Sequence, residues 1–212
     1  MIEPELLDEA SPEEARGNLR DLVRINRHFG GYRILRKLVS GLVSAEERFS
    51  MLDIGAASGD MGAALRASYP MARVTSLDRS FTHLALASEP KIVGDAFSLP
   101  FQPGSFDLVF SSLFLHHFSN DQIVGLLSNA KRVARRAVLA IDLERGPMAY
   151  YFIPATQWLF GWHSISMHDG PASVQAAFKK DELLKLALQA ELKHARVAAH
   201  RPWSRLSLVA RV

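Results

Sequence analysis

The chain has 212 residues, of which 48% are hydrophobic and 22% are charged, a composition typical of a folded globular protein. The formal net charge is only +3, whereas a nucleic-acid-binding protein usually carries a denser basic face, so we expect no nucleic-acid partner. No cysteine is present, which excludes disulfides, thiolate catalysis and cysteine-ligated metals.

The N-terminus and the longest apolar run bear on the location of the protein. Residues 1–15 are acidic, lack an apolar core and are expected to be a flexible leader rather than a secretory signal. The run at residues 147–162 is interrupted by Pro154 and Gln157 and is shorter than the roughly 20 apolar residues of a membrane-spanning helix. We therefore expect a cytoplasmic protein without a membrane span.

Two helices are predicted before the main domain. The first runs from Pro12 to about His28, and its apolar face carries Leu19, Leu22, Val23, Asn26 and Phe29. Glycines 30 and 31 break it, and the second helix runs from Tyr32 to about Leu42. We expect residues 1–45 to form an N-terminal helical cap.

From residue 49, short apolar strands alternate with helices. Strands are predicted at 49–54, 72–78, 91–95, 105–112 and 135–142, and helices at 60–68, 81–88 and 120–133. Short strands joined by helices predict right-handed βαβ units and a parallel sheet.

The end of the chain has a different pattern. A helix is predicted at 179–191, followed by strands at 194–200 and 204–212, which are joined too closely to be parallel. The predicted fold class is α/β, a Rossmann-like, mostly parallel seven-stranded sheet with a C-terminal antiparallel hairpin and helices on both faces.

A glycine loop, LDIGAASGD at residues 52–60, follows the first strand. Ligands of open α/β sheets bind beyond the carboxyl ends of the strands. There Gly55 would let the chain turn and Gly59 would let the backbone approach a ligand. The dinucleotide fingerprint would need glycines at Ala57 and Asp60, and an acid at position 60 would repel a pyrophosphate. A cofactor without phosphates is therefore favoured over a nucleotide-dependent oxidoreductase, although a glycine turn that merely ends a strand is the plainer alternative.

Acids end the next two predicted strands. Asp78 could accept hydrogen bonds from ribose hydroxyls. Asp95, followed by the amide of Ala96 or Phe97, offers the acceptor and donor that an adenine edge needs. Either acid could instead be a turn former or a helix cap.

Four segments in order resemble the class I S-adenosylmethionine (SAM)-dependent methyltransferases over residues 49–145. LDIGAASGD resembles the glycine loop, SLD the ribose acid, GDAFSLPF the adenine segment and FDLVFSSLFLHHF the strand that faces the substrate. Within the family the chain looks most like the ubiquinone/menaquinone methyltransferase-like group. The segments NLRDLVRINRHFGGYR and MHDGPASVQAAF are also similar to segments of small bacterial natural-product methyltransferases.

The resemblance implies SAM as cofactor and S-adenosyl-L-homocysteine as product. The cofactor-binding residues that it implies are Asp53, Gly55, Ala56, Gly59, Asp78, Arg79, Asp95, Ala96 and Ser111. Ala57 stands where family members often have a third glycine. A weakened site, or an inactive SAM- or nucleoside-binding protein, is therefore an alternative.

Methyl transfer is an in-line displacement in which the protein mainly supplies proximity and alignment. A phenol-like acceptor benefits from a base with a pKa of ~6.5, and two adjacent histidines follow the fourth strand. We take His117 as the first candidate base and His116 as the second, with Asp142 as a further catalytic candidate. The expected substrate is a small, largely apolar phenol or quinol that is methylated on oxygen or carbon.

No metal is expected, because His163, His168 and Asp169 have no common ligand spacing and no Asp-Asn pair follows Asp142. The oligomeric state stays open.

The remaining assignments concern the insert and the arginines. Residues 46–145 would form the SAM-binding core, 146–178 a substrate-side insert and 179–212 the C-terminal helix and hairpin of a single domain. The aromatic residues of the insert predict an apolar lid, or the packing of an extra helix, and they are Tyr150, Tyr151, Phe152, Trp158, Phe160 and Trp162. HDG at 168–170 would be a turn or loop that helps to close the pocket.

The first helix has a row of arginines, which predicts a solvated face formed by Arg16, Arg20, Arg24 and Arg27. A second interpretation has Arg27 or Arg33 reaching the carboxylate of SAM.

Overall fold

The computed structural model describes residues 6–212, apart from the side chains at positions 8 and 9. The strands are β1 (Ser50–Ile54), β2 (Arg73–Asp78), β3 (Lys91–Val93), β4 (Phe106–Ser112), β5 (Ala134–Leu143), β6 (Arg196–His200) and β7 (Arg205–Arg211). The α-helices are α1 (Leu6–Glu9), α2 (Pro12–His28), α3 (Gly31–Ser40), α4 (Asp60–Ser68), α5 (Asn120–Val133), α6 (Pro147–Phe160), α7 (Ser164–Ala176) and α8 (Lys180–Gln189). Two 3₁₀ turns are η1 (His83–Leu86) and η2 (Leu115–His117).

Local sequence explains where the longer helices begin. Ser11 and Glu14 form a capping box at the start of α2, in which each residue's side chain accepts a hydrogen bond from the other's amide. Ser119 and Gln122 form the same motif at the start of α5. The expected helix over 81–88 is only the single turn η1. The leader expected over residues 1–15 lies partly outside the described residues, and its described part contains α1 and the start of α2.

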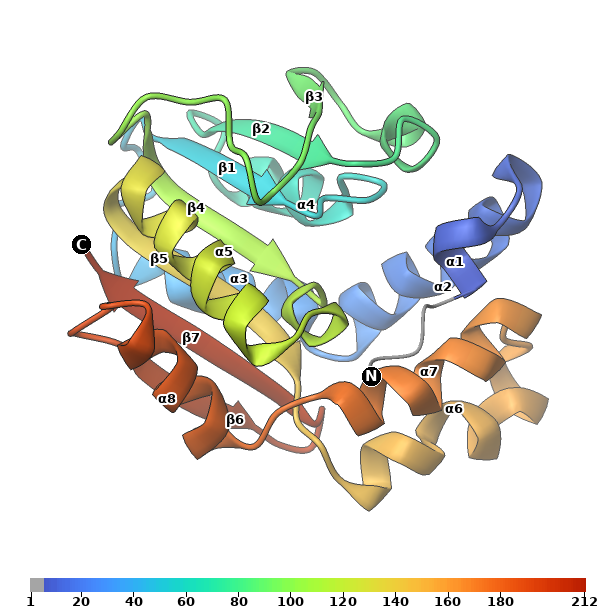
Figure 1. Ribbon diagram of the computed structural model, residues 1–212. Coiled ribbons are helices and arrows are strands. Elements are labelled where there is room, and N and C mark those ends of the chain that lie inside the picture. The colour runs from blue at the N-terminus through green and yellow to red at the C-terminus, as the bar shows by residue number, and fades with distance from the viewer. Residues whose placement is uncertain (1–5) are drawn as a thin grey trace.

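The sheet has the order β3-β2-β1-β4-β5-β7-β6. The first five strands are parallel, and β7 runs antiparallel to both β5 and β6 (Figure 1). The predicted fold class is therefore confirmed. The strand order reverses between β1 and β4, and this switch point is where open α/β sheets bind ligands.

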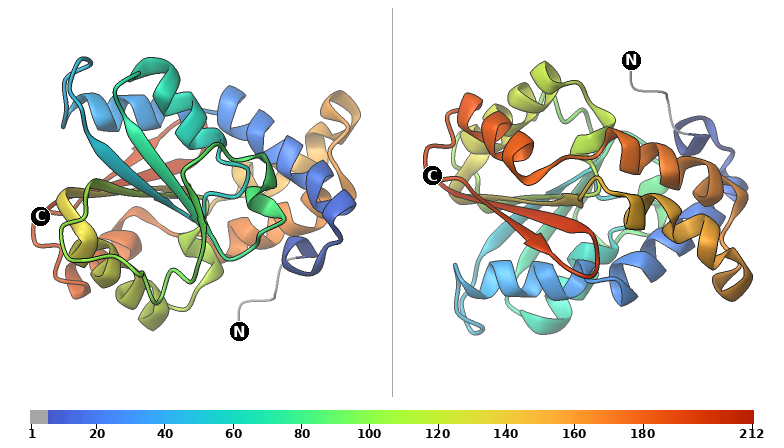
Figure 2. Two further views of the ribbon diagram at one scale, coloured as in Figure 1. Left: turned by 90° about the horizontal axis from the view of Figure 1, so that it is seen from above. Right: turned by 90° about the horizontal axis from the view of Figure 1, so that it is seen from below.

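Helices cover both faces of the sheet, as Figure 2 shows. Leu52 and Val109 contribute to a core with α5 and α8, whereas their neighbours Met51 and Leu108 contribute to a core with α3 and α4. This alternation follows from the period of two in a strand. Within the segment expected to form the cap, α3 instead packs on the sheet, because Ile34, Leu35 and Val39 are buried in the second core.

The insert leaves the sheet after β5 and returns to nearly the same point. The Arg145 amide donates to the Phe178 carbonyl at 2.9 Å, so the two ends of the insert are held together. Between them are two helices, α6 and α7, which lie with α1 and α2 beyond the carboxyl ends of the parallel strands (Figure 1). HDG lies inside α7, so the expected turn at 168–170 is wrong. Within the described residues, no helix is both long and apolar enough to cross a membrane.

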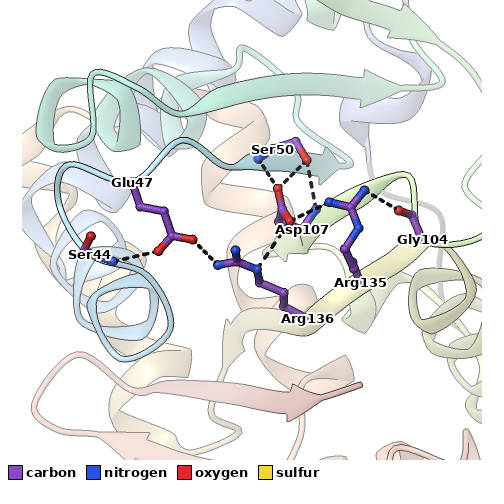
Figure 3. Close-up of polar contacts among 7 residues, drawn as sticks. All are labelled: Ser44, Glu47, Ser50, Gly104, Asp107, Arg135 and Arg136. Atoms are coloured by element: carbon purple, nitrogen blue, oxygen red, sulfur yellow. Dashed lines mark hydrogen bonds and ion pairs between the residues drawn. The ribbon is translucent and has the colours of Figure 1, made fainter.

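A polar cluster ties the amino ends of β1, β4 and β5 together at the opposite edge of the sheet (Figure 3). One oxygen of Asp107 accepts from the amide and hydroxyl of Ser50 at 2.9 and 3.0 Å. The other accepts from Arg135 at 2.9 Å, and Arg136 bridges Asp107 to Glu47. Burial alone would raise the pKa of Asp107, but these hydrogen bonds and arginines hold it below its ordinary value.

Candidate active site

A cavity of about 780 Å³ lies at the carboxyl ends of the strands, within the size range of ligand pockets in proteins. One wall consists of the glycine loop and the ends of β2 and β4. The opposite wall is formed by α2, α6 and α7. The predicted residues that line this cavity are Asp53, Gly55, Ala56, Asp78, Arg79, Asp95, Ala96, His116 and His117.

The glycine loop needs backbone freedom at three positions. Gly55 has φ +68°, and a Cβ there would clash with the ring of Phe114. Gly59 has φ +71° but does not line the cavity. A Cβ there would lie 2.8 Å from Cβ of Ala87, so Gly59 allows the loop to pack on that residue rather than to approach a ligand. Ala57 also has positive φ, at +46°, and it lines the cavity.

Asp78 shapes the loop and faces the cavity at the end of β2. Its carboxylate accepts from the amides of Ala57 and Ser80, each at 2.9 Å. Each oxygen retains a further lone pair, so the group can still accept two hydroxyl hydrogen bonds. Asp95 accepts from the Phe97 amide at 2.9 Å, which leaves the amide of Ala96 as the donor for an adenine edge.

Asp53 and Asp60 form an acidic wall below the loop. Asp53 is 1% exposed, and its Oδ2 has no hydrogen-bond partner in the described part of the chain. Burial raises the pKa of Asp53 well above its usual value, and the nearby acids Asp60 and Asp78 raise it further. Burial also raises the pKa of Asp60. This wall would favour a cationic group on a ligand.

His116 and Asp142 form a buried pair on the β4–β5 side of the cavity. Nδ1 of His116 lies 2.6 Å from Oδ1 of Asp142, and the two side chains are 4% and 1% exposed. Oδ2 of Asp142 accepts from the Leu115 amide at 2.9 Å, which fixes the carboxylate under η2. Burial would raise the pKa of Asp142, but His116 and the hydrogen bonds lower it overall, so the carboxylate is ionised. Asp142 itself does not line the cavity.

Two serines at the end of β4 show how side-chain direction changes with one position. Ser111, expected to bind the cofactor, lines only a small separate cavity beside α5. Its neighbour Ser112 lines the main cavity, because successive side chains of a strand point to opposite faces.

The aromatic residues of the insert divide between the inside and outside of the molecule. Of the six aromatic residues named from the sequence, only Phe152 lines the cavity. Trp162 is buried beside Phe152, with 6.2 Å between the two ring centroids. Tyr151 and Trp158 are 62% and 84% exposed, so they form no part of a lid. The apolar wall instead combines other residues, including Leu22, Ile25, Phe29, Met148, Ile153 and Val174.

The arginines proposed for the SAM carboxylate do not reach the cavity. Arg27 is exposed, and Arg33 lies over the Trp203 ring at 5.3 Å. The buried guanidinium in the cavity wall belongs to Arg205, the first residue of β7. Arg205 was not predicted. Its only sequence signal was a cation at the head of a strand whose middle is mostly apolar.

Asn26, which the sequence shows as a polar residue on the apolar face of its helix, links the cap helix α2 to the site. Its Nδ2 donates to Asp60 at 3.0 Å, and its Oδ1 accepts from Arg205 at 3.2 Å. Within the described residues, no group of three histidine, aspartate or glutamate side chains could hold a metal ion.

The cavity fits SAM in three respects. Asp78 can accept from a ribose diol, and Ala96 with Asp95 can meet an adenine edge. The unpartnered oxygen of Asp53 suits the ammonium at the methionyl end. The acids that line the cavity would repel a pyrophosphate, and they are Asp53, Asp60, Asp78, Asp95 and Asp169.

Comparison with known proteins gives an independent assignment. Residues 52–141 match the family described as a methyltransferase domain. A demethylmenaquinone methyltransferase from Thermotoga maritima is 31% identical over 132 residues, which are 60% of this chain and 57% of that protein. The chain therefore spans less than two thirds of the length of this curated relative.

Solved structures share the fold at low sequence identity. A methyltransferase solved with the Trm112 activator of Haloferax volcanii has a TM-score of 0.67 and 18% identity, over 99% of this chain and 98% of that one. A SAM-dependent methyltransferase from Aquifex aeolicus has a TM-score of 0.59 and 15% identity, over 84% and 89%. Human N-acetylserotonin methyltransferase in complex with SAM has a TM-score of 0.59 and 18% identity, over 84% and 51%. Residues 52–141 thus match a methyltransferase domain, and the chain shares the fold of solved SAM-dependent methyltransferases.

Proposed function

We propose that the chain transfers the methyl group of SAM to a hydroxyl oxygen of a small, largely apolar, phenol- or quinol-like acceptor. The observation that carries this proposal is the buried His116–Asp142 pair, of which His116 lines the cavity. A base held by a carboxylate in this way suits an acceptor that must lose a proton.

The bound SAM would supply a methyl group on a sulfonium, which is already reactive. The chain's own residues would orient the acceptor and take its proton. Asp142 accepts the hydrogen on Nδ1 of His116, which makes Nε2 the basic nitrogen. The acceptor hydroxyl would lose its proton to Nε2 while the methyl group passes from the sulfonium sulfur to the acceptor oxygen, which leaves S-adenosylhomocysteine. The Asp142 carboxylate stabilises the resulting imidazolium, so Asp142 is a positioning residue rather than a catalytic one.

The geometry favours His116 over His117 as the base. His117 also lines the cavity, and its ring stacks on His116 at a centroid distance of 4.4 Å. Nδ1 of His116 is held 2.6 Å from the Asp142 carboxylate, and His116 is the more deeply buried of the two residues. We therefore place His116 first, with His117 as the second candidate.

The cavity wall supports an apolar acceptor. Much of the wall on the side of α2, α6 and α7 is apolar and includes Phe29, Phe152 and Val174, which suits a ring or alkyl chain. The Thermotoga maritima relative is named for demethylmenaquinone, which has the same general character.

The test is formation of S-adenosylhomocysteine with a series of alkyl-substituted phenols and quinols, measured by mass spectrometry. His116→Gln should lower kcat by about 10²–10⁴-fold while SAM affinity is retained. His194→Gln, at an exposed position outside the cavity, is the matched control. Binding of SAM without turnover of any acceptor would favour the inactive binding protein instead, and an unchanged rate in His116→Gln would remove this residue from the mechanism.

A further inference from the structure

Arg205 is a buried cation whose hydrogen-bonding capacity is incompletely used. The side chain is 1% exposed. Its Nε donates to the Phe29 carbonyl at 3.2 Å and its Nη2 to Asn26 at 3.2 Å, but Nη1 has no partner among the described residues. Burial lowers the pKa of Arg205 to about 10, so the guanidinium is still charged at neutral pH.

No carboxylate in the described part of the chain lies within ion-pair distance of this guanidinium. A buried charge is costly unless it is paired, because water no longer solvates it. Asp142 and Asp60 partly offset the cost of burying this charge, but they act on Arg205 only through their electrostatic field. A bound anion would supply the missing partner.

Asp53 complements Arg205 in the same cavity. Both side chains are about 99% buried, both line the cavity, and each has one polar atom without a partner in the described chain. One is a carboxyl group, whose charged form a nearby ammonium would stabilise, and the other is a cation. Asp60 also lines the cavity, and Asn26 hydrogen-bonds both Asp60 and Arg205, at 3.0 and 3.2 Å. A ligand with an ammonium and a carboxylate on one carbon would satisfy both.

We infer that Arg205 binds the carboxylate at the methionyl end of SAM, opposite the ammonium at Asp53. This inference rests on the proposed function. It assigns a cofactor-binding role to the first residue of β7, a strand outside the parallel part of the sheet.

Asn26 positions Arg205 for this role. It holds Nη2 with its carbonyl oxygen and donates to Asp60 with its amide nitrogen. The guanidinium is thereby fixed at one end, with Nη1 left for the ligand. Because Asn26 belongs to α2, binding of the carboxylate would also hold the cap helix against the glycine loop.

The test compares SAM, decarboxylated SAM and 5′-methylthioadenosine by calorimetry. The wild-type protein should bind SAM about ten- to a hundredfold more tightly than decarboxylated SAM, the range expected for a charge-assisted hydrogen bond. Arg205→Met should bring this ratio close to one and leave the affinity for decarboxylated SAM unchanged. Arg211→Met, near the other end of β7 and outside the cavity, should keep the wild-type ratio.

Several outcomes would overturn the inference. Equal binding of SAM and decarboxylated SAM by the wild-type protein does so without any variant. An unchanged ratio in Arg205→Met overturns it as well. If that variant then lost affinity only for a carboxylated acceptor, the anion bound by Arg205 would be the carboxylate of the acceptor. Binding of 5′-methylthioadenosine reports whether the variant is folded. If it is not, the neutral variant Arg205→Gln replaces it, and an undiminished ratio there overturns the inference. Failure of the wild-type protein to bind any of the three nucleosides would overturn the proposed function itself.

Discussion

Ala57 is the residue at which the chain departs from the glycine pattern of the SAM-dependent methyltransferases that it resembles. Its φ of +46° lies in the left-handed region, where a Cβ crowds the following carbonyl oxygen at a cost of roughly 1–2 kcal/mol. The hydrogen bond from its amide to Asp78 stabilises this conformation. The loop thus keeps the shape that a glycine would adopt, at a local cost in stability.

Ala57→Gly should therefore stabilise the protein by up to about 1 kcal/mol and should not weaken SAM binding, because the Cβ that it removes lines the cavity. Thermal unfolding with and without SAM measures both effects. Ala63→Gly, at an exposed position within α4, is the control and should lose about 1 kcal/mol. A lower Tm for Ala57→Gly would show that the alanine is not strained.

At the scale of elements, the amino ends of β1, β4 and β5 depend on one carboxylate. Asp107 joins Ser50 of β1 to Arg135 and Arg136 of β5 (Figure 3). These strands carry the glycine loop and the His116–Asp142 pair at their other ends. The cluster therefore holds the register of the strands that position the site, without taking part in the chemistry.

Asp107→Asn should lower the free energy of unfolding at pH 7 by about 1–3 kcal/mol, through loss of charge-assisted hydrogen bonds. The folded-state pKa of Asp107 is depressed, so its contribution is present above the unfolded pKa of about 3.9 and is lost as the pH falls through the folded value. Urea unfolding between pH 7 and pH 3 should thus show the wild-type and variant curves converging below about pH 4. Glu46→Gln, at an exposed position, should change stability little at any pH. A gap that is constant with pH would contradict the assignment.

At the scale of the whole molecule, the cavity is covered on one side by α2 and α7, which are far apart in the sequence and together form its roof. Asp21 of α2 accepts from the His163 amide and the Ser166 hydroxyl, both at 2.7 Å. Asn18 donates to the same hydroxyl at 3.1 Å. The cap helix α2 and the insert are thus joined by a buried set of hydrogen bonds, the polar seam, and both line the cavity.

Asp21→Ala should loosen this seam, because the partners it leaves would be buried without an acceptor. Amide hydrogen exchange over residues 164–176 should accelerate, while exchange in β1 and β4 should be unchanged. Arg20→Ala, on the exposed side of α2, is the control and should leave both regions as in the wild-type protein. Equal acceleration in the strands would mean that Asp21 supports the whole fold rather than the roof.

The sheet and its topology follow from local patterns in the chain. Strand and helix positions agree within a few residues, because periodicity and capping act over neighbouring residues. Connection lengths then separate the parallel strands from the final antiparallel pair. The sequence could bring Asp53, Asp78, Asp95 and His116 together in one cavity, because parallel strands present their carboxyl ends at one edge of the sheet.

The remaining features depend on long-range packing. Arg205 meets Asn26 across 179 positions, and no local pattern encodes that contact. Ser112 rather than Ser111 lines the cavity because a shift of one residue reverses the face of a strand. Trp158 is exposed whereas Phe152 lines the cavity. Apolar residues are spread around most of α6, so the orientation of this helix is set by its packing against α7 and not by its own sequence. Local interactions thus determine the helices and strands and the edge of the sheet at which the cavity lies. Which side chains meet in that cavity is decided by the packing of segments that are distant in the sequence.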